Sequence, residues 1–376
     1  MSHLTPNPLA LALPSWILKM RRAHARLLLA ALFGGHAVTA AATPYGLTAE
    51  EIAQLAVEER SALARPIATV VDKPGPSPTG DSHDYVSYAR YYWPNPDTPD
   101  GLPFVRRDGQ HNRAQVAQGD HARLWQFCAT VESLAAAWTV NQNPAVAKRA
   151  GDWLRAWFIT PTTRMNPHVE YAQIRLGHHG NRGTEFGVLD ARCLAQVIDG
   201  LRLLEDSPAL SATETAAVQS WFSTYLQWLT TSEAGTAERA NTNNHGTWYI
   251  AQAVPIALYL GHEDLARELC ESEKLRIARE IEPDGRQPQE ITRADGLSYS
   301  QFNLEAHASV ARLAANLGLD LWNYTAPNGA NLRQALEFLR PYNSAPETWP
   351  FTQGHELPAG FLDQLLQEPA IAQEKL

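Results

Sequence analysis

The stretch Leu124–Trp138, with the sequence LWQFCATVESLAAAW, sets the fold class of this chain. Its apolar residues recur at spacings of three and four, which places them on one face of an α-helix. The same spacing returns at Val146–Trp157, Leu189–Leu204, Val218–Leu229 and Leu332–Leu339. The sequence therefore predicts an all-α protein built of antiparallel helical hairpins. Periodicity leaves open whether the hairpins form a bundle, a solenoid or a closed α/α toroid.

Long polar and aromatic stretches separate the predicted helices, at residues 71–113, 160–186 and 280–300. Loops of this length inside a compact domain are usually either functional or disordered. The first of them is rich in Tyr, Trp, His and Arg around residues 83–93, a composition that disordered segments lack. We therefore expect the chemistry of the protein to reside in these loops.

Composition excludes several classes of protein. The chain has 376 residues, 44% of them hydrophobic, enough for one large or two modest domains and too apolar for a disordered protein. Its formal charge of −9 argues against nucleic acid as a partner, because phosphate binding needs a basic surface. A local cluster of Arg and His side chains can still bind a polyanion. The eleven Trp and twelve Tyr either stack on sugar rings or fill the core.

The N-terminal segment has the pattern of an export signal. A basic stretch, an apolar run and the small residues Ala40–Ala42 follow one another, which is the order of a cleavable signal peptide. We expect residues 1–42 to be removed, with residues 1–19 lying upstream of a true start at Met20. Residues 43–376 are then one domain that is periplasmic or secreted. The apolar run is shorter than the roughly 20 residues of a membrane span, so no span is expected in the mature chain.

The cysteines and histidines indicate neither a disulfide framework nor a metal site. Cys128, Cys193 and Cys270 are an odd number without C-x-x-C spacing, which favours buried free thiols. The adjacent His178 and His179 point apart along the chain and lack the further ligands of a metal site. We expect no metal and no cofactor.

Two constellations of residues can carry catalysis. The first is the run NTNNHGTWY at the start of a predicted helix. Its Asn244 and His245, with Trp248 beside them, are expected near the unpaired N–H groups of that helix, a place suited to a carboxylate. The second contains Arg293 and Tyr299, which stand six residues apart at the start of another helix. Each has a structural alternative, with Asn244 as a helix cap and Tyr299 as a core side chain.

These groups meet the needs of β-elimination from a polyuronate. The C5 proton of a uronate becomes acidic when hydrogen-bond donors neutralise the adjacent carboxylate, and Arg, Asn and protonated His do so without a metal. A base then removes this proton and an acid protonates the bridging oxygen at C4. In D-mannuronate and D-glucuronate both atoms lie on one face of the ring, so one Tyr can serve both steps. A neighbouring Arg is the device expected to lower the pKa of that phenol from about 10.

Several segments, in the right order, resemble the alginate lyase family. They are Ser82–Gly109, Trp157–Gln173, Asn243–Trp248 and Asp284–Leu304. The resemblance implies an α/α toroid, a closed or incomplete barrel of antiparallel helical hairpins. It also implies metal-independent β-elimination by an exported enzyme whose partner is an acidic polysaccharide. We expect this enzyme to be a monomer that binds no nucleic acid.

The motifs are similar to those of polysaccharide lyase families 5 and 38. In family 5 an Asn-Asn-His run and an Arg–Tyr pair form the site, and Asn244 and His245 match the run directly. The sequence spacing between Arg293 and Tyr299 is one residue shorter than in family 5 and is closer to the family 38 pattern. Assigning the family 5 roles to these two residues therefore depends on a slightly different loop. The resemblance implies Tyr299 as acid and base and His245 as a carboxylate neutraliser or second base. Asn244 and Arg293 are then the remaining neutralisers.

Further residues of the long loops are candidates for binding neighbouring sugar units, together with Trp248. They are His83, Arg90, Tyr92 and Trp93 in the first loop, and Arg164, Asn166, Tyr171 and Gln173 in the second. Plain packing of Trp93 and a turn at Asn166 are the structural alternatives.

Two rival functions fit an α/α toroid. A glycoside hydrolase needs two carboxylates flanking the scissile bond, and no pair can be placed from the sequence among Glu170, Glu185, Asp190, Glu290 and Asp295. A non-catalytic sugar-binding protein would keep the fold and the cleft without the chemistry.

Overall fold

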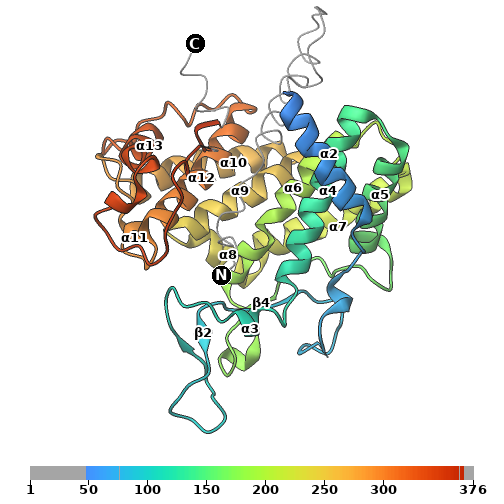
Figure 1. Ribbon diagram of the computed structural model, residues 1–376, viewed down its shortest axis with the longest axis horizontal. Coiled ribbons are helices and arrows are strands. Elements are labelled where there is room, and N and C mark those ends of the chain that lie inside the picture. The colour runs from blue at the N-terminus through green and yellow to red at the C-terminus, as the bar shows by residue number, and fades with distance from the viewer. Residues whose placement is uncertain (1–47, 76, 364, 368–376) are drawn as a thin grey trace, which may run out of the picture. The chain divides into compact units, whose positions relative to one another are not determined.

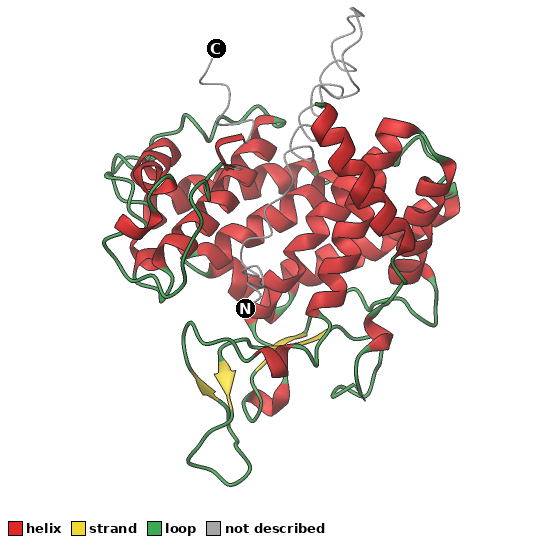
Figure 2. Cartoon of the chain, in the orientation of Figure 1, coloured by secondary structure: helices red, strands yellow, loops and turns green. Residues whose placement is uncertain are grey.

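The structure of the protein is a computed structural model, and it describes residues 48–75, 77–363 and 365–367. Helices dominate this part of the chain and strands are few and short (Figure 2). The all-α prediction is therefore confirmed. The predicted signal segment, residues 1–42, lies outside the described residues.

The main helices and strands follow the predicted order (Figure 1). The helices are α2 (Ala49–Ala64), α3 (Arg113–Val116), α4 (His121–Asn141), α5 (Pro144–Leu154), α6 (Leu194–Leu203), α7 (Ala212–Thr231), α8 (Glu233–Ala240), α9 (Asn244–Tyr259), α10 (Glu263–Glu280), α11 (Pro288–Ile291), α12 (Gly296–Ala315) and α13 (Leu332–Leu339). The strands are β1 (Val86–Tyr88), β2 (Tyr92–Trp93), β3 (Val105–Arg106) and β4 (Tyr171–Ile174). β1 pairs with β4 in parallel, and β2 pairs with β3 in antiparallel register.

Local signals in the sequence set several of the helix ends. Thr48 and Glu51 form a capping box at α2, because each side chain bonds the backbone N–H of the other residue. Ser211 and Glu214 do the same at α7. Asn143 caps α5 by accepting the N–H of Ala145 at 3.0 Å. Such caps satisfy N–H groups that the helix itself leaves unpaired.

Contacts divide the chain into two compact units. One unit contains residues 48–240 and 255–263, and the other contains 241–254 together with the described part of 264–376. Helix α9 is divided between the units at Pro255: its residues up to 254 belong to the unit that contains 264–376, and its residues from 255 belong to the unit that contains 48–240. The catalytic candidates of the α9 and α12 segments all belong to the second unit, so their geometry can be analysed within it.

The core of the 48–240 unit is centred on α4, which packs against α2, α5 and α6. The predicted stripe of this helix is buried along its length, from Leu124 at 0% exposure to Trp138 at 8%. The Phe127 ring stacks on Trp157 with 4.6 Å between ring centroids and 6° between planes. Offset stacking of this kind adds to the stabilisation that burial provides.

In the other unit, α12 is buried along most of its length and packs against α11 and α13. Several of its buried residues are polar, namely Ser298, Ser300, Gln301, Asn303 and His307. A buried polar group destabilises the fold unless it finds a hydrogen-bond partner. The buried polar side chains of this helix therefore require polar partners on the neighbouring elements. Tyr299, a catalytic candidate, lies on the same helix.

The three cysteines are free and buried, as predicted. The sulfur atoms of Cys128 and Cys193 lie 3.3 Å apart. Burial raises the pKa of the Cys270 thiol to about 12 and that of Cys128 well above its ordinary value. Over the described ranges, no helix combines the length and the apolarity that crossing a membrane requires.

A matched pair of leucine truncations tests the assignment of the core. Leu134 on α4 is completely buried, whereas Leu275 on α10 is 73% exposed. Leu134→Ala should lower the free energy of unfolding by about 2–5 kcal/mol because it leaves a cavity. Leu275→Ala should change it by less than about 0.5 kcal/mol. Urea denaturation measures both, and equal effects would contradict the assigned burial.

Candidate active site

The Asn-Asn-His run begins α9, and a buried carboxylate from another helix holds its first residue. Glu290 of α11 accepts the backbone N–H of Asn244 at 2.8 Å and its side-chain amide, also at 2.8 Å. Both residues are 1% exposed. Burial raises the pKa of Glu290, and the two hydrogen bonds from Asn244 oppose that rise. The carboxylate thus caps α9 and fixes the orientation of the Asn244 amide.

His245 follows Asn244 and remains partly exposed. Its backbone N–H donates to the side-chain oxygen of Asn243 at 3.1 Å. The loop before α9 is also linked to α11 by the amide of Gln289, which donates to Thr242 at 3.0 Å. Two adjacent residues of α11 therefore hold the segment that carries His245.

Arg293 and Tyr299 meet as the sequence predicts. The guanidinium donates a hydrogen bond to the Tyr299 hydroxyl at 2.9 Å, and its central carbon lies 4.0 Å from the centroid of the same ring. Tyr299 is 6% exposed, and its hydroxyl accepts this hydrogen bond. A cation in this position stabilises negative charge on the phenol oxygen.

Helices α9 and α12 also meet through their aromatic residues. Trp248, one turn into α9, packs on Phe302 of α12 with 4.9 Å between ring centroids. Phe302 lies one turn after Tyr299 on the same helix. The structure therefore ties the Asn244 segment to the Arg293–Tyr299 segment twice, through Glu290 and through this aromatic contact.

Gly246 is required by the close approach of a buried arginine. A side chain at this position would collide with the guanidinium of Arg276 and with the Asn241 carbonyl. Arg276 donates to that carbonyl at 2.8 Å and to Glu280 at 2.8 Å. The glycine thus allows Arg276 to hold the backbone of the Asn-Asn-His run.

A buried polar network lies behind the catalytic candidates. His307 of α12 bonds Glu273 through Nδ1 and lies 3.5 Å from Glu280 through Nε2. Thr247, in the first turn of α9, donates to Glu280 at 2.7 Å. Burial alone would lower the pKa of His307, but the two facing carboxylates raise it to about 9. The imidazolium therefore stays charged near neutral pH and links α9, α10 and α12.

In the 48–240 unit, three of the predicted sugar-binding residues lie together. His83 Nδ1 is 2.6 Å from the Arg164 carbonyl. The backbone N–H of Asn166 donates to the His83 carbonyl at 3.0 Å, and the Asn166 amide donates to Asp84 at 2.8 Å. Two long loops that are far apart in sequence therefore form one surface here.

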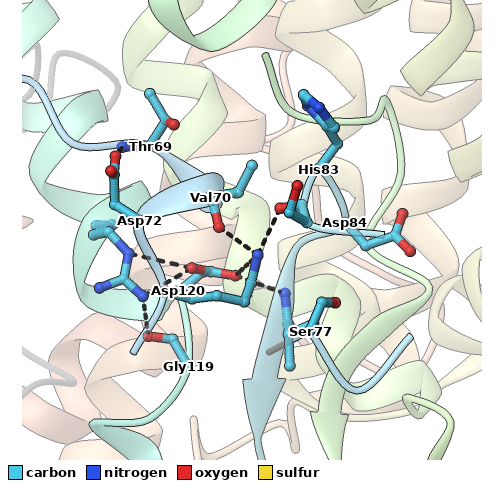
Figure 3. A network of polar contacts seen from close by, with 12 residues as sticks. Thr69, Val70, Asp72, Ser77, His83, Asp84, Gly119 and Asp120 are labelled. Atoms are coloured by element: carbon cyan, nitrogen blue, oxygen red, sulfur yellow. Dashed lines mark hydrogen bonds and ion pairs between the residues drawn. The ribbon is translucent and has the colours of Figure 1, made fainter. Parts of the chain in front are cut away.

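Asp120, the residue before α4, anchors the segment that leads to His83 (Figure 3). Its carboxylate accepts the N–H of Val86 at 3.0 Å and lies 3.4 Å from the Lys73 ammonium. Lys73 also donates to the Ser82 carbonyl at 2.7 Å. Burial raises the pKa of Asp120 and lowers that of Lys73, and the attraction between them opposes both shifts.

Tyr92 and Trp93 form β2 and are partly exposed, as is Arg90 just before them. The Arg175 guanidinium lies 5.0 Å from the Tyr92 ring centroid, and the His178 ring packs edge-on at 5.9 Å. The Trp93 indole donates to a carbonyl of the same loop at 2.9 Å. These contacts fix the rings while leaving part of each accessible.

Tyr171 and Gln173 lie on β4 with different surroundings. The Gln173 amide donates to the Phe186 carbonyl at 3.0 Å and to buried Asp190 at 2.9 Å, which uses both of its hydrogens. Tyr171 is partly exposed and lies near His168, with 6.3 Å between the rings. In this structure Gln173 stabilises the loop and Tyr171 is accessible.

Sequence reasoning missed Glu290 and Arg276 as parts of the site. Glu290 entered only as a possible hydrolase carboxylate. A signal for it was present, because a Glu three residues before Arg293 lies in the same loop as the Arg–Tyr pair. Arg276 lies on the regular helix α10, where nothing in the local pattern marks it as a partner of Gly246.

The buried imidazolium predicts how stability depends on pH. The pKa of His307 is about 9 in the folded protein and about 6.5 in an unfolded chain. A raised pKa stabilises the fold fully below pH 6.5 or so, and this contribution, up to roughly 3 kcal/mol, is lost as the pH rises through about 9. Urea denaturation across this range should show a steeper fall for the wild type than for His307→Gln. Equal slopes would contradict the assignment.

Comparison with protein families identifies this chain. The family model described as alginate lyase matches residues 69–349. A search of curated proteins finds no significant match.

Solved structures of alginate lyases are similar to the chain. A crystal structure of an alginate lyase from Bacteroides ovatus is 32% identical in sequence to this chain, with a TM-score of 0.81. The matched region covers 86% of this chain and 88% of the Bacteroides ovatus chain. Alginate lyase A1-III from Sphingomonas species A1 is 16% identical, covers 97% and 91%, and has a TM-score of 0.55. A variant of A1-III complexed with a tetrasaccharide is 16% identical, covers 96% and 89%, and has a TM-score of 0.53. Alginate lyases have an α/α toroid fold, so the predicted fold class is confirmed. The chain belongs to the alginate lyase family.

Proposed function

We propose that this polysaccharide lyase cleaves a polyuronate, either alginate or glucuronan, by metal-independent β-elimination across C4 and C5. The observation that carries the proposal is the hydrogen bond of 2.9 Å from Arg293 to the Tyr299 hydroxyl. This bond places a cation next to the phenol, and the chain belongs to a family of lyases. We also propose that the enzyme is a monomer that acts in the periplasm or outside the cell.

Tyr299 serves as both base and acid in this proposal. The phenolate, stabilised by Arg293, removes the C5 proton, and the resulting phenol then protonates the bridging oxygen as the C4–O bond breaks. The electron pair released at C5 forms the C4=C5 double bond, so atoms and charges balance without an added reactant. A single residue can perform both steps only where the two atoms lie on one ring face, as in D-mannuronate and D-glucuronate.

Neutralisation of the uronate carboxylate falls to Arg293, Asn244 and His245. The Arg293 guanidinium, which bonds the Tyr299 hydroxyl, is always charged and attracts the uronate carboxylate. The Asn244 amide has two N–H donors, and Glu290 takes one. His245 is partly exposed, and it acts as a neutraliser or a second base. Removing charge from the carboxylate favours loss of the adjacent proton.

Substrate binding beyond the reacting sugar is proposed for the accessible loop residues. They are His83, Arg90, Tyr92, Trp93, Arg164, Asn166 and Tyr171, with Gln173 supporting the loop and Trp248 on helix α9. Aromatic rings that are fixed by their neighbours but partly exposed suit stacking on sugars. The basic side chains among them suit an acidic polysaccharide.

The glycoside hydrolase alternative is disfavoured by the two carboxylates that precede Tyr299 in the sequence. Glu290 and Asp295 are 1% and 5% exposed. Glu290 is bonded to Asn244, and Asp295 is bonded to His355. A hydrolase needs two carboxyl groups that reach opposite sides of the scissile bond, and neither of these is free to do so.

Product analysis tests the proposed reaction. The protein should convert polymannuronate or glucuronan, faster than polyguluronate, into products with the ultraviolet absorbance of a double bond conjugated to a carboxylate. A chelator should leave the rate unchanged, because the charge neutralisation comes from side chains. New reducing ends without this absorbance would instead establish hydrolysis.

Substitutions in the proposed site separate an enzyme from a sugar-binding protein. Tyr299→Phe and His245→Ala should each reduce the elimination rate by at least about 100-fold, as expected for loss of an acid–base group. Oligosaccharide binding by Tyr299→Phe, measured by calorimetry, should persist. Normal turnover of Tyr299→Phe would refute the assignment of the site.

A further inference from the structure

A C-terminal segment, Thr352–His355, lies against the start of helix α12. Gln353 and Asp295 form an isolated antiparallel β-bridge. A backbone N–H from each side donates to a carbonyl of the other side, at 2.9 Å in both cases. This segment, called the clamp below, begins after residue 349, where the match to the family model ends.

Gln353 of the clamp caps the helix that carries Tyr299. The first N–H groups of a helix have no partner within the helix, and the preceding residue, Asp295, makes no side-chain cap here. Gln353 Oε1 instead accepts the N–H of Leu297 at 3.0 Å. Its Nε2 donates to the Ser298 hydroxyl at 3.0 Å. One side chain therefore bonds the two residues that precede Tyr299.

Asp295 holds the other side of the clamp. Its carboxylate is buried, and one oxygen accepts the N–H of Gly354 at 3.1 Å and that of His355 at 3.0 Å. The His355 ring lies 2.8 Å from the same oxygen. Breaking these contacts would leave a buried carboxylate unpaired, which is costly, so the turn at Asp295 and the clamp hold each other in place.

We propose that the clamp positions Arg293 and Tyr299 for elimination, with Gln353 as a positioning residue. This rests on the function proposed above. Arg293 lies two residues before Asp295 and Tyr299 four residues after it, so the clamp fixes the turn between the guanidinium and the phenol. A displacement of about 1 Å at reacting groups can slow a reaction by as much as 100-fold. The hydrogen bond between Arg293 and Tyr299 therefore depends on a segment that bonds this helix across 56 residues of sequence.

The test compares two replacements of Gln353. Gln353→Met keeps the length of the side chain but loses its hydrogen bonds, and it should lower kcat roughly tenfold or more with KM little changed. Gln353→Glu keeps an acceptor at the helix N-terminus, where a negative charge is favourable, and should recover most of that loss. Should Gln353→Met fail to fold, Ser298→Ala removes one clamp bond and is measured in the same way.

Gln301→Ala is the matched control. Gln301 also lies on α12 and donates to a carbonyl of the C-terminal region, that of Phe361, at 3.0 Å. This contact lies after Tyr299 in the helix, so its loss should cost stability while kcat stays near the wild-type value. The same kcat in Gln353→Met and Gln301→Ala would overturn the positioning role, even if both proteins were less stable.

Amide hydrogen exchange tests the clamp independently of the proposed function. Peptides that cover residues 294–300 should exchange faster in Gln353→Met than in the wild type or Gln301→Ala. Unchanged exchange would overturn the clamp itself. If the wild type gave no unsaturated product from any uronate polymer, the proposed function would fail. If exchange were nevertheless faster in Gln353→Met, the clamp would stand as a structural contact without a role in catalysis.

Discussion

The contact between buried Glu290 and Asn244 is the interaction on which the rest of the proposed active site depends. Burying a carboxylate is costly, and here two hydrogen bonds of 2.8 Å and the start of a helix offset that cost. The carboxylate belongs to α11, three residues before Arg293, whereas Asn244 begins α9. One pair of side chains therefore sets where two stretches of chain, separated by 46 residues, approach each other.

A second layer of charges supports this contact from within the same unit. Arg276 and the imidazolium of His307 face the carboxylates of Glu273 and Glu280, so two cations balance two anions in a buried region. Such networks stabilise only when every member is bonded, since an unpaired buried charge is highly unfavourable. The network explains why Gly246 follows the Asn-His pair, because Arg276 occupies the space that a side chain would need.

Features set by neighbouring residues could be predicted from the sequence, and features set by distant residues could not. The stripe from Leu124 to Trp138 and the capping boxes follow from spacing alone, and the structure confirms them. The contact between Arg293 and Tyr299 was also predictable, because six residues across a helix start keep two side chains close. The bond from Glu290 to Asn244 depends on tertiary packing, which no local pattern encodes. Asn244 is deeply buried, and that bond satisfies its polar groups.

The position of Arg293 explains why the proposed reaction needs arginine rather than lysine here. The guanidinium bonds the Tyr299 oxygen and also lies over its ring, which a planar group with several donors can do and a compact ammonium cannot. The permanent charge of the same group also attracts the uronate carboxylate. The phenolate and the carboxylate would then share one cation. Removal of the C5 proton neutralises the phenolate as charge develops towards the carboxylate, so the guanidinium stabilises the transition state without moving.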